Sequence, residues 1–482
     1  MPVTHDRRVP RPGKVASPAF AAEELAQITG GQLVVRSPRP IRGAAVDSRI
    51  VNPGELFVAL PGERTDGHEF LAAAVARGAA ALLVTRLPDG TDASLGDVTI
   101  IQVADGLAAL HAVAAAWRAR FDPLVVGVTG SIAKTSTKEA IAAVLGERHV
   151  TLKNEGNQNN EIGLPLTILR LGPEHEAAVL EMGMYAGGEI ADLAAIARPR
   201  IGVVTAIQPV HLSRIGTLEA IDRAKGELIE ALPRDGYAVL NADDTRVRRM
   251  ATRTDAPALT YGFAADADVR AEDARSAGMD GMRFTLSTQG GSVPVSVPTL
   301  GRIAVHNALA GAATGIAAGL SLEAIAAGLA MGWSAPHRTE LVRAGGVTIV
   351  DDSYNASPAS VTAALDLLGG LPGRRVAVLG EMLELGEGHE SGHRAVGEAA
   401  AAVADLLVVV GDRATGIADG AVAAGLAPGR IVRTATRETA LEVLRPRLRD
   451  GDVVLVKASR GIELDLLVDA LRAELAAGAG AR

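Results

Sequence analysis

The fold is decided by one stretch of sequence, LVVGVTGSIAKTSTKEAIAAVLGER (Leu124–Arg148). It opens with a continuous apolar run, Leu124–Thr129, which predicts a buried strand. A glycine-containing turn follows, and apolar residues at helical spacing predict a helix that begins at Thr135. A strand that runs through such a turn into a helix indicates a parallel α/β fold. In this arrangement backbone N–H groups and the helix N-terminus can bind a phosphate.

The turn itself, TGSIAKTS (Thr129–Ser136), fits the short phosphate-loop pattern TGxxGK(S/T) with Ala133 in place of the second glycine. In that pattern Lys134 reaches the β- and γ-phosphates of a nucleotide, and the Thr135 hydroxyl binds Mg²⁺. If position 133 requires a positive φ, the alanine Cβ costs about 1–2 kcal/mol. The pattern alone leaves open a plain strand-to-helix turn that carries a surface lysine.

Composition narrows the class of protein. The chain has 482 residues, which suggests about three domains of ~150 residues. Hydrophobic residues make up 48% and aromatic residues 2%, which favours helices and parallel strands over an aromatic-rich sandwich. The net charge of −8 is unlike that of a general nucleic-acid binder, and the absence of cysteine excludes disulfides, thiolate catalysis and Cys-ligated zinc. No apolar run approaches the ~20 residues of a membrane span.

The fold class predicted from these patterns is α/β, with three domains behind an N-terminal extension. Residues 1–17 carry Arg, Lys and Pro without the apolar block of a signal peptide, so we expect them to be flexible. We expect a first domain at 18–122, a central domain with a mostly parallel sheet at 123–331, and a Rossmann-like domain at 332–482. The main strands predicted for the last two domains, besides Leu124–Thr129, are Ala177–Glu181, Gly202–Ala206, Ala238–Asn241, Thr348–Asp352, Arg375–Gly380, Leu406–Gly411, Arg430–Arg433 and Val453–Lys457.

A series of further segments occurs in a fixed order along the chain. They are TGSIAKTSTKE (Thr129–Glu139), NEGNQNNEIGLP (Asn154–Pro165), VLEMGMYAGGEI (Val179–Ile190), PVHLSRIGT (Pro209–Thr217), RAKGEL (Arg223–Leu228), LNADD (Leu240–Asp244), VDDSYNASPASVTAAL (Val350–Leu365), VAVLGEMLELG (Val376–Gly386) and VLVKASRG (Val454–Gly461). Together they resemble the Mur ligases, the ATP-dependent peptide ligases of bacterial cell-wall synthesis. The forms DDSYNA and GEMLELG resemble those of the member that adds D-alanyl-D-alanine. The resemblance runs from Ile28 to Leu471.

The resemblance implies a cytoplasmic enzyme of peptidoglycan precursor synthesis. Its first domain is expected to bind the UDP-sugar, the central P-loop-type domain ATP, and the third domain the incoming amine. ATP would phosphorylate the terminal carboxylate of UDP-N-acetylmuramoyl-tripeptide. The amino group of D-Ala-D-Ala would then attack the acyl phosphate, and a tetrahedral intermediate would collapse to the amide and phosphate. We expect no nucleic-acid partner, no membrane span and a monomer.

The resemblance also implies roles for individual residues. Catalysis would fall to Lys134, Lys225, His211 and Glu181, with Thr135, Glu181, His211 and Lys225 binding an expected two Mg²⁺ ions. Lys225 matches a lysine that the family carries as a carbamate, an anion formed from a neutral amine and CO₂. ATP binding would fall to Thr129, Gly130, Ser131, Ile132, Ala133, Lys134, Thr135, Ser136, Asn307, Arg338, Asp352 and Asn355. Substrate binding would fall to Ser48, Arg49, Asn157, Asn159, Asn160, Tyr354, Lys457 and Arg460.

Three positions depart from the pattern of the family, all on the ATP side. Ala133 replaces the loop glycine, Ala206 stands where an asparagine is usual, and Ile303-Ala304 stand where a His-Asn pair is usual near the adenine. Buried polar contacts are worth about 1–3 kcal/mol each when deleted, so these changes bear on nucleotide affinity more than on the fold. His306 offers a substitute polar group in the same segment.

Three functional hypotheses therefore remain open at this stage. The first is an active ligase with the stated specificity. The second is a related ligase with a different amine or acid, against which the DDSYNA and GEMLELG segments argue. The third is a non-catalytic UDP-sugar-binding homologue with an impaired ATP site, supported by the three departures.

Overall fold

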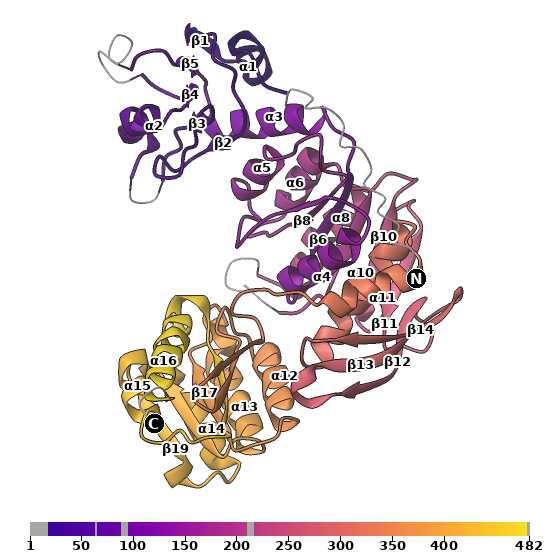
Figure 1. Cartoon of the computed structure of the whole chain (residues 1–482), viewed down its shortest axis with the longest axis vertical. Helices are drawn as coiled ribbons and strands as arrows, with labels where there is room; N and C mark the ends of the chain where they lie inside the picture. Colours follow the sequence, from indigo (N-terminus) through magenta and orange to yellow (C-terminus); the bar gives the residue numbers. More distant parts are fainter. Residues whose placement is uncertain (1–17, 63–64, 88–94, 210–215, 480–482) are drawn as a thin grey trace, which may run out of the picture. The chain divides into compact units, whose positions relative to one another are not determined.

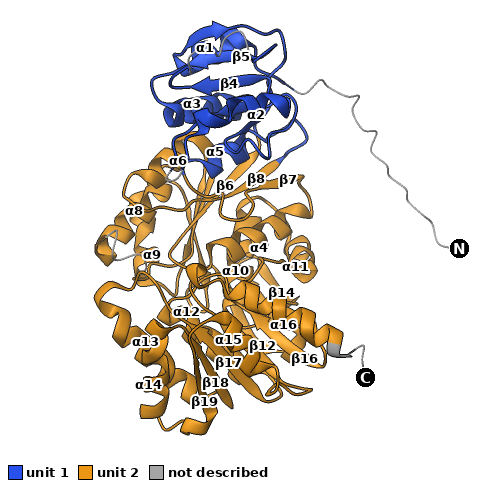
Figure 2. Cartoon of the chain, turned by 90° about the vertical axis from the view of Figure 1, so that its left-hand side faces the viewer, with its two compact units in different colours: residues 1–122, 161–176 blue, residues 123–160, 177–482 orange. Residues whose placement is uncertain are grey.

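The computed structural model describes residues 18–62, 65–87, 95–209 and 216–479, and it has three sheets flanked by helices (Figure 1). These residues form two compact units (Figure 2). Unit 1 contains the described residues up to Asp122 together with Glu161–Glu176, and unit 2 contains Pro123–Asn160 and the described residues from Ala177 onward. The α/β class predicted from the sequence is confirmed.

Unit 1 is built on a five-stranded sheet with the order β1-β5-β4-β3-β2. Its strands are β1 (Gln32–Val35), β2 (Ala44–Ala45), β3 (Leu56–Val58), β4 (Ala81–Val84) and β5 (Thr99–Gln102), and β1 alone of these pairs antiparallel to its neighbour. The helices are α1 (Ala22–Thr29), α2 (Leu71–Ala76), α3 (Gly106–Arg118) and α5 (Gly163–Ile168), with a 3₁₀ turn η1 (Gly67–Phe70). Side chains of β3, β4 and β5, such as Phe57, Leu82 and Ile100, form its core.

The first sheet of unit 2 has nine strands in the order β14-β13-β12-β11-β10-β9-β6-β8-β7. They are β6 (Leu124–Thr129), β7 (Thr151–Lys153), β8 (Ala177–Glu181), β9 (Ile201–Val204), β10 (Tyr237–Asn241), β11 (Ala258–Gly262), β12 (Val269–Ser276), β13 (Met282–Thr288) and β14 (Gly291–Val297). Strands β6 to β12 pair in parallel, and β12, β13 and β14 form an antiparallel extension. The sequence analysis did not predict this extension.

Helices cover this sheet and set the position of the site. The helices that follow or precede its strands are α4 (Lys134–Gly146), α6 (Glu189–Ala197), α8 (Leu218–Glu230), α9 (Thr245–Arg249), α10 (Arg302–Ala317) and α11 (Leu322–Met331), with 3₁₀ turns η2 (Met250–Arg253) and η3 (Gly278–Asp280). Side chains of α4, α10 and α11 share one core with the inward residues of the strands. On α8, Leu228 lies so close to β6 that a Cβ at Gly127 would be 2.7 Å from its Cδ1.

The second sheet of unit 2 has six strands in the order β15-β16-β20-β17-β18-β19. They are β15 (Glu340–Ala344), β16 (Val347–Asp351), β17 (Arg375–Gly380), β18 (Leu406–Val410), β19 (Ile431–Thr434) and β20 (Val453–Lys457), all parallel except the β15–β16 pair. Five helices flank them: α12 (Pro358–Gly369), α13 (His389–Ala401), α14 (Thr415–Ala423), α15 (Arg437–Leu444) and α16 (Leu464–Ala479). Short 3₁₀ turns are η4 (Gly386–Gly388), η5 (Asp412–Ala414), η6 (Pro428–Arg430) and η7 (Arg460–Ile462).

The helices of this sheet divide between its two faces. Side chains of α12, α13 and α14 form one core with β16, β17, β18 and β20, and side chains of α15 and α16 form a second core on the other face. This is the doubly wound arrangement expected of a Rossmann-like sheet. Within the described residues no helix is both long and apolar enough to cross a membrane.

Trp117, near the end of α3, makes several buried contacts within unit 1. Its ring is buried, lies 5.1 Å from the ring of Phe20 and 5.6 Å from that of Phe121, and its Nε1 donates to the carbonyl of Leu171 at 3.0 Å. The tryptophan therefore ties the returning segment 161–176 to the rest of unit 1.

We expect Trp117→Ala to lower the free energy of unfolding by about 3–5 kcal/mol, because it removes a large buried ring. Trp117→Phe keeps ring contacts and loses the hydrogen bond, so a smaller loss of about 1–3 kcal/mol is expected. Urea unfolding followed by far-UV circular dichroism measures both. Equal unfolding midpoints for the wild type and the two variants would show that this contact is not needed.

Candidate functional site

The phosphate loop occupies the carboxyl end of β6, and its geometry requires Gly130. This residue has φ 147°, and a Cβ there would lie 1.9 Å from Thr205 Oγ1. The same Thr205 hydroxyl donates to the carbonyl of Ile132 at 2.6 Å, and Ser131 N–H donates to the carbonyl of Ala206 at 2.8 Å. The end of β9 thus holds the loop, and Ala206 contributes through its backbone.

Ala133 adopts the left-handed conformation, with φ 62° and ψ 4°, directly before α4. The positive φ considered from the sequence is therefore present, with its expected cost of about 1–2 kcal/mol. Among the described residues no side chain caps this helix N-terminus. The first N–H groups of α4 have no partner within the helix, so they are available to an anion.

Lys134 is the first residue of α4 and turns back toward the loop. Its Nζ donates to the carbonyl of Gly130 at 2.9 Å. Burial lowers the pKa of Lys134, the nearby Glu181 carboxylate opposes that shift, and the Arg338 guanidinium adds to it. Lys134, Glu181 and Arg338 are therefore close enough to interact electrostatically, although they come from distant parts of the sequence.

Glu181 ends β8, the strand beside β6, and is almost fully buried. Its Oε2 accepts a hydrogen bond from Thr135 Oγ1 at 2.8 Å, and its Oε1 accepts one from Asn159 Nδ2 at 2.7 Å. Asn154 clamps the backbone of Glu181, since its Oδ1 accepts the Glu181 N–H at 2.9 Å and its Nδ2 donates to the Glu181 carbonyl at 3.0 Å. Three residues predicted as site residues, Thr135, Asn159 and Glu181, thus meet at one point.

Asn154 is a residue that the sequence analysis quoted without assigning it a role. It is 2% exposed and fixes the direction of Glu181. Its place as the first residue of NEGNQNN was the available signal. Of the other asparagines in that segment, Asn157 accepts the Asn159 N–H through its carbonyl at 2.7 Å, and Asn160 ends the segment within unit 2.

Lys225, on α8, is the second lysine of the site and is buried. Burial lowers its pKa well below the ordinary value, Lys134 lowers it further, and Glu181 opposes the shift. Burial and Lys134 therefore both shift Lys225 toward its neutral amine. His211, predicted as a metal ligand, lies outside the described residues.

The residues present fit a hard divalent cation in part. Thr135 and Glu181 offer the oxygen donors that Mg²⁺ prefers. Within the described residues there is no group of three or more His, Cys, Asp or Glu that could hold a metal ion. Lys225 as an amine adds no oxygen donor, whereas Lys225 as a carbamate would.

A cleft opens beside the start of α4. Its lining consists of Ser136, Pro298, Thr299, Leu300, Ile303, Ala304, Asn307, Trp333, Ser334, Ala335, Arg338, Thr339, Glu340 and Leu341. It brings together three residues predicted to bind ATP, namely Ser136, Asn307 and Arg338. Asn307 Oδ1 accepts a hydrogen bond from Thr137 Oγ1 at 3.0 Å, and Ile303 is partly exposed in the cleft wall. The walls at positions 303 and 304 are thus apolar.

His306 does not belong to the lining of that cleft within the described chain. Its Nε2 lies 3.3 Å from Asp243 Oδ2, and its ring meets Phe263 edge-on with centroids 4.9 Å apart. Burial lowers the pKa of His306. Its polar group is therefore directed to Asp243 instead of replacing the side chains missing at 303 and 304.

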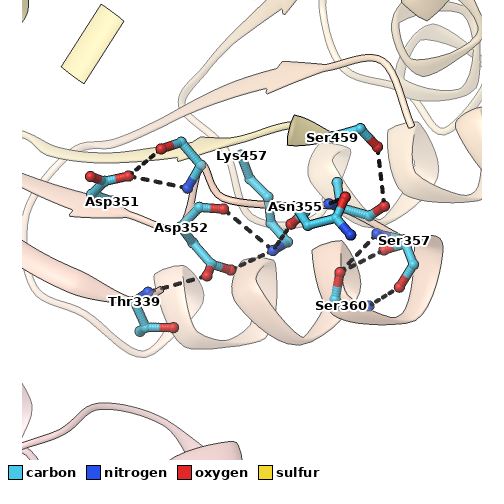
Figure 3. Close-up of polar contacts among 10 residues, drawn as sticks. Thr339, Asp351, Asp352, Asn355, Ser357, Ser360, Lys457 and Ser459 are labelled. Carbon is cyan, nitrogen blue, oxygen red and sulfur yellow. Dashed lines mark hydrogen bonds and ion pairs between the residues drawn. The ribbon is translucent and has the colours of Figure 1, made fainter. Parts of the chain in front are cut away.

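Three of the predicted residues, Asp352, Asn355 and Lys457, lie in the loop after β16 and at the end of β20 (Figure 3). Lys457 Nζ is buried and donates to Asp352 Oδ2 at 2.6 Å and to the carbonyl of Asn355 at 2.8 Å. Asp352 Oδ1 also accepts the Thr339 N–H at 3.1 Å. Through these contacts Lys457 and Asp352 hold the loop that carries Tyr354 and Asn355.

Two guanidinium groups lie near the ring of Tyr354. The Arg338 guanidinium is 4.1 Å from the centre of the Tyr354 ring and that of Arg460 is 5.5 Å from it. The residues on either side of Arg338, His337 and Thr339, have positive φ of 60° and 56°. Strained backbone around a cation is typical of functional sites. Arg338, Tyr354 and Arg460 are thus brought together as predicted residues.

Ser48 and Arg49 lie in unit 1. Ser48 is buried, and the Arg49 side chain is largely exposed and pairs with Asp47 Oδ2 at 2.6 Å. The hydrogen bond from Arg49 lowers the pKa of Asp47. In unit 2, Thr129 and Ser131 act within the protein, since Thr129 Oγ1 donates to the Met182 carbonyl at 2.9 Å and Ser131 Oγ to that of Gln208 at 3.0 Å.

Known protein families and solved structures match this chain in sequence and in fold. Three family profiles match the chain: "Mur ligase family, catalytic domain" over residues 40–118, "Mur ligase middle domain" over 128–315, and "Mur ligase, glutamate ligase domain" over 337–460. The UDP-N-acetylmuramoyl-tripeptide–D-alanyl-D-alanine ligase of Mycobacterium leprae is 39% identical, with 93% of this chain and 97% of the relative covered. The chain belongs to the Mur ligase family.

Other relatives agree with that membership. The ligase of the same name from Escherichia coli is 38% identical over 93% of this chain and 97% of its own length. Among solved structures, MurF from Acinetobacter baumannii superposes with a TM-score of 0.86 at 30% identity, covering 95% of this chain and all of that one. MurF from Thermotoga maritima, solved in complex with ADP, has a TM-score of 0.79 at 30% identity, covering 90% and 98%.

The strain at Ala133 can be tested by Ala133→Gly. We expect this change to raise the free energy of unfolding by about 0.5–1 kcal/mol, because glycine removes the left-handed penalty and only part of that gain is lost to chain entropy. The matched control is Ala143→Gly in the middle of α4, which is expected to lower stability by about 0.5–1 kcal/mol. Chemical denaturation measures both. A loss of stability in Ala133→Gly would contradict the left-handed conformation.

Proposed function

We propose that this chain is the ATP-dependent ligase that adds D-alanyl-D-alanine to UDP-N-acetylmuramoyl-tripeptide in peptidoglycan precursor synthesis. The observation that carries the proposal is the cluster of Lys134, Thr135, Glu181 and Lys225 at the carboxyl ends of β6 and β8. Relatives with that name, which match over nearly the full length of both chains, support the choice of substrates. The setting proposed is the cytoplasm.

The chemistry requires that a carboxylate be activated before an amine can attack it. The γ-phosphoryl group of ATP passes to the terminal carboxylate of the UDP-sugar peptide, which forms the acyl phosphate and releases ADP. Such a transfer depends on positioning and charge neutralisation. Lys134 and the free N–H groups of α4 supply both at the phosphates, and Arg338 adds a third positive group. Bound Mg²⁺, held by Thr135 and Glu181, would neutralise further phosphate charge.

In the second step the amino group of D-Ala-D-Ala attacks the acyl carbon. A C–N bond forms, the bond from carbon to the phosphate oxygen breaks, and the amine loses a proton. We assign the incoming amine to the loops of the second sheet of unit 2, around Tyr354 and Arg460. The UDP-sugar is assigned to the domain of residues 18–122, with Ser48 and Arg49. ATP is assigned to the domain of residues 123–331, where Asn307 lines the cleft beside the start of α4.

Phosphate release tests this function. Purified protein with ATP, Mg²⁺, UDP-N-acetylmuramoyl-tripeptide and D-Ala-D-Ala is expected to release phosphate only when both the acceptor and the dipeptide are present. Lys134→Met is expected to lower kcat by about 100-fold or more, because a charge that stabilises the transition state is lost. A protein that binds the UDP-sugar without releasing phosphate would instead support the non-catalytic alternative, and release with a different amine would support a related ligase.

We further propose that Lys225 is carried as a carbamate. Its amine is buried and its pKa is lowered, which favours the neutral form that reacts with CO₂. The neutral amine and CO₂ form the carbamate with release of a proton, which places an anion beside Lys134. The repulsion that lowers the pKa of the amine then becomes an attraction, and a third oxygen ligand joins Glu181 and Thr135.

The carbamate can be observed directly. Protein equilibrated with ¹³C-bicarbonate is expected to show a carbamate carbon signal by NMR that is lost in Lys225→Arg. Lys153→Arg serves as the matched control, because Lys153 is a more exposed lysine paired with Glu139. A spectrum of Lys225→Arg identical to that of the wild type would refute the carbamate and leave the ligase assignment intact.

A further inference from the structure

The carboxyl edge of the six-stranded sheet has a topological switch point. The adjacent strands β20 and β17 lead to helices on opposite faces, since β17 continues into α13 and β20 continues into α16. In open α/β sheets ligands bind where neighbouring strands diverge in this way. The loops at this switch point are Glu381–Gly386 after β17 and the segment after Lys457, the last residue of β20.

The loop after β17 is held rigidly by buried polar groups. Leu383 N–H donates to Ser459 Oγ at 2.9 Å, and Ser459 N–H donates to the carbonyl of Glu381 at 3.0 Å. On its other side Met382 N–H donates to Nε2 of His393 at 3.0 Å, and Nδ1 of His393 bonds to the His389 carbonyl at 2.7 Å. His393 is fully buried, and burial lowers its pKa. The backbone of this loop is thus preorganised.

The side chain of Glu381 takes no part in holding the loop. It is 9% exposed, and its Oε1 lies 3.3 Å from Nε2 of His389 and 3.3 Å from a terminal nitrogen of Arg413. Charge-assisted hydrogen bonds are normally about 2.7–2.9 Å long, so both contacts are loose. Arg413 follows β18 in η5, and its side chain is 71% exposed. A buried carboxylate therefore lies beside the side chain of an arginine that remains accessible.

We propose that Arg413, oriented by Glu381, binds the terminal carboxylate of the dipeptide substrate. This inference rests on the proposed function. A guanidinium group is the usual partner of a carboxylate, because its fork of N–H donors matches both oxygens. Glu381 acts through Arg413 and is a positioning residue. The His389 ring lies beside Glu381 as well, with its centroid 4.2 Å from that of His393 and its plane tilted to it.

The spacing of the strands explains why a dipeptide fits. Tyr354 and Arg460 follow β16 and β20. The guanidinium groups of Arg460 and Arg338 both lie near the Tyr354 ring, and Arg338 is close enough to Lys134 to lower its pKa. The amine that attacks the acyl phosphate belongs on the side of Arg338. Arg413 follows β18, two strands from β20, which is about 9–10 Å across the sheet edge. Two residues span about 7 Å, so a dipeptide with an arginine reaching toward it bridges the gap.

The test compares two ligands and a set of variants. D-Ala-D-alaninamide lacks the carboxylate and keeps the amine. We expect the wild type to prefer D-Ala-D-Ala over this amide by about 10–100-fold in kcat/KM, the worth of a hydrogen-bonded charge pair. In Arg413→Met the ratio of kcat/KM for D-Ala-D-Ala to kcat/KM for its amide is expected to fall to near one. The cause would be a higher KM for the dipeptide, while the KM for ATP stays unchanged. Arg413→Lys is expected to be intermediate, and Glu381→Gln to raise the dipeptide KM with kcat retained.

The matched control is Arg433→Met. Arg433 is on the next strand, β19, and pairs with Asp419 at the surface, so the preference is expected to stay as in the wild type. An active Arg413→Met protein that still prefers the dipeptide over its amide would overturn the inference and leave the ligase function standing. If the wild type releases no phosphate at all, calorimetry with the UDP-acceptor and a non-hydrolysable ATP analogue decides the matter. Equal binding of D-Ala-D-Ala by the wild type and Arg413→Met would then overturn it.

Discussion

The structure of the site depends on one electrostatic constraint: a partly buried lysine, Lys134, and a buried lysine, Lys225, share one buried carboxylate, Glu181. Burial lowers the pKa of Lys134 and Lys225, each is close to Glu181, and Lys134 lowers the pKa of Lys225 further. A single carboxylate cannot neutralise two ammonium groups, and an unpaired charge on the buried Lys225 would cost several kcal/mol. The arrangement becomes favourable when anionic phosphates arrive, or when one lysine is neutral or converted into an anion. The unbound site is therefore poised for negative charge.

The surrounding backbone serves to keep that constraint in place. Asn154 clamps the backbone of Glu181, while Thr135 and Asn159 occupy its two oxygens. Gly127 on β6 pairs with Gly202 on β9, and the lack of a Cβ at Gly127 lets Leu228 of α8 approach the sheet. This close approach brings Lys225 of the same helix to the strand ends. The carboxyl ends of parallel strands meet at one edge, so residues far apart in sequence converge there.

Much of this could be predicted from the sequence because the relevant signals are local. The strands Leu124–Thr129 and Ala177–Glu181 have the bounds that were predicted, since a continuous apolar run ends in a polar residue at each carboxyl end. The antiparallel strands β12 to β14 were missed, because their outward residues are polar and the segment lacks a continuous apolar run. The ion pair of Lys457 with Asp352 also escaped prediction. It joins residues over one hundred positions apart, and strand register, which sequence does not reveal, brings them together. Likewise, the return of Glu161–Glu176 to unit 1 depends on tertiary contacts such as that of Trp117.

Asp352 and Glu381, two carboxylates that follow strands of unit 2, differ in how closely they hold their cations. The difference indicates which pair stabilises a loop and which can bind a ligand. Asp352 and Lys457 form a short, buried pair of 2.6 Å whose ammonium also bonds to the Asn355 carbonyl, so it has little capacity left for a ligand. Glu381 and Arg413 are 3.3 Å apart, with the carboxylate buried and most of the guanidinium exposed. An incoming carboxylate can bind the outer N–H groups of Arg413 without breaking the contact to Glu381, because a guanidinium carries five donors. The first pair therefore fixes a loop, and the second leaves a charge available for binding.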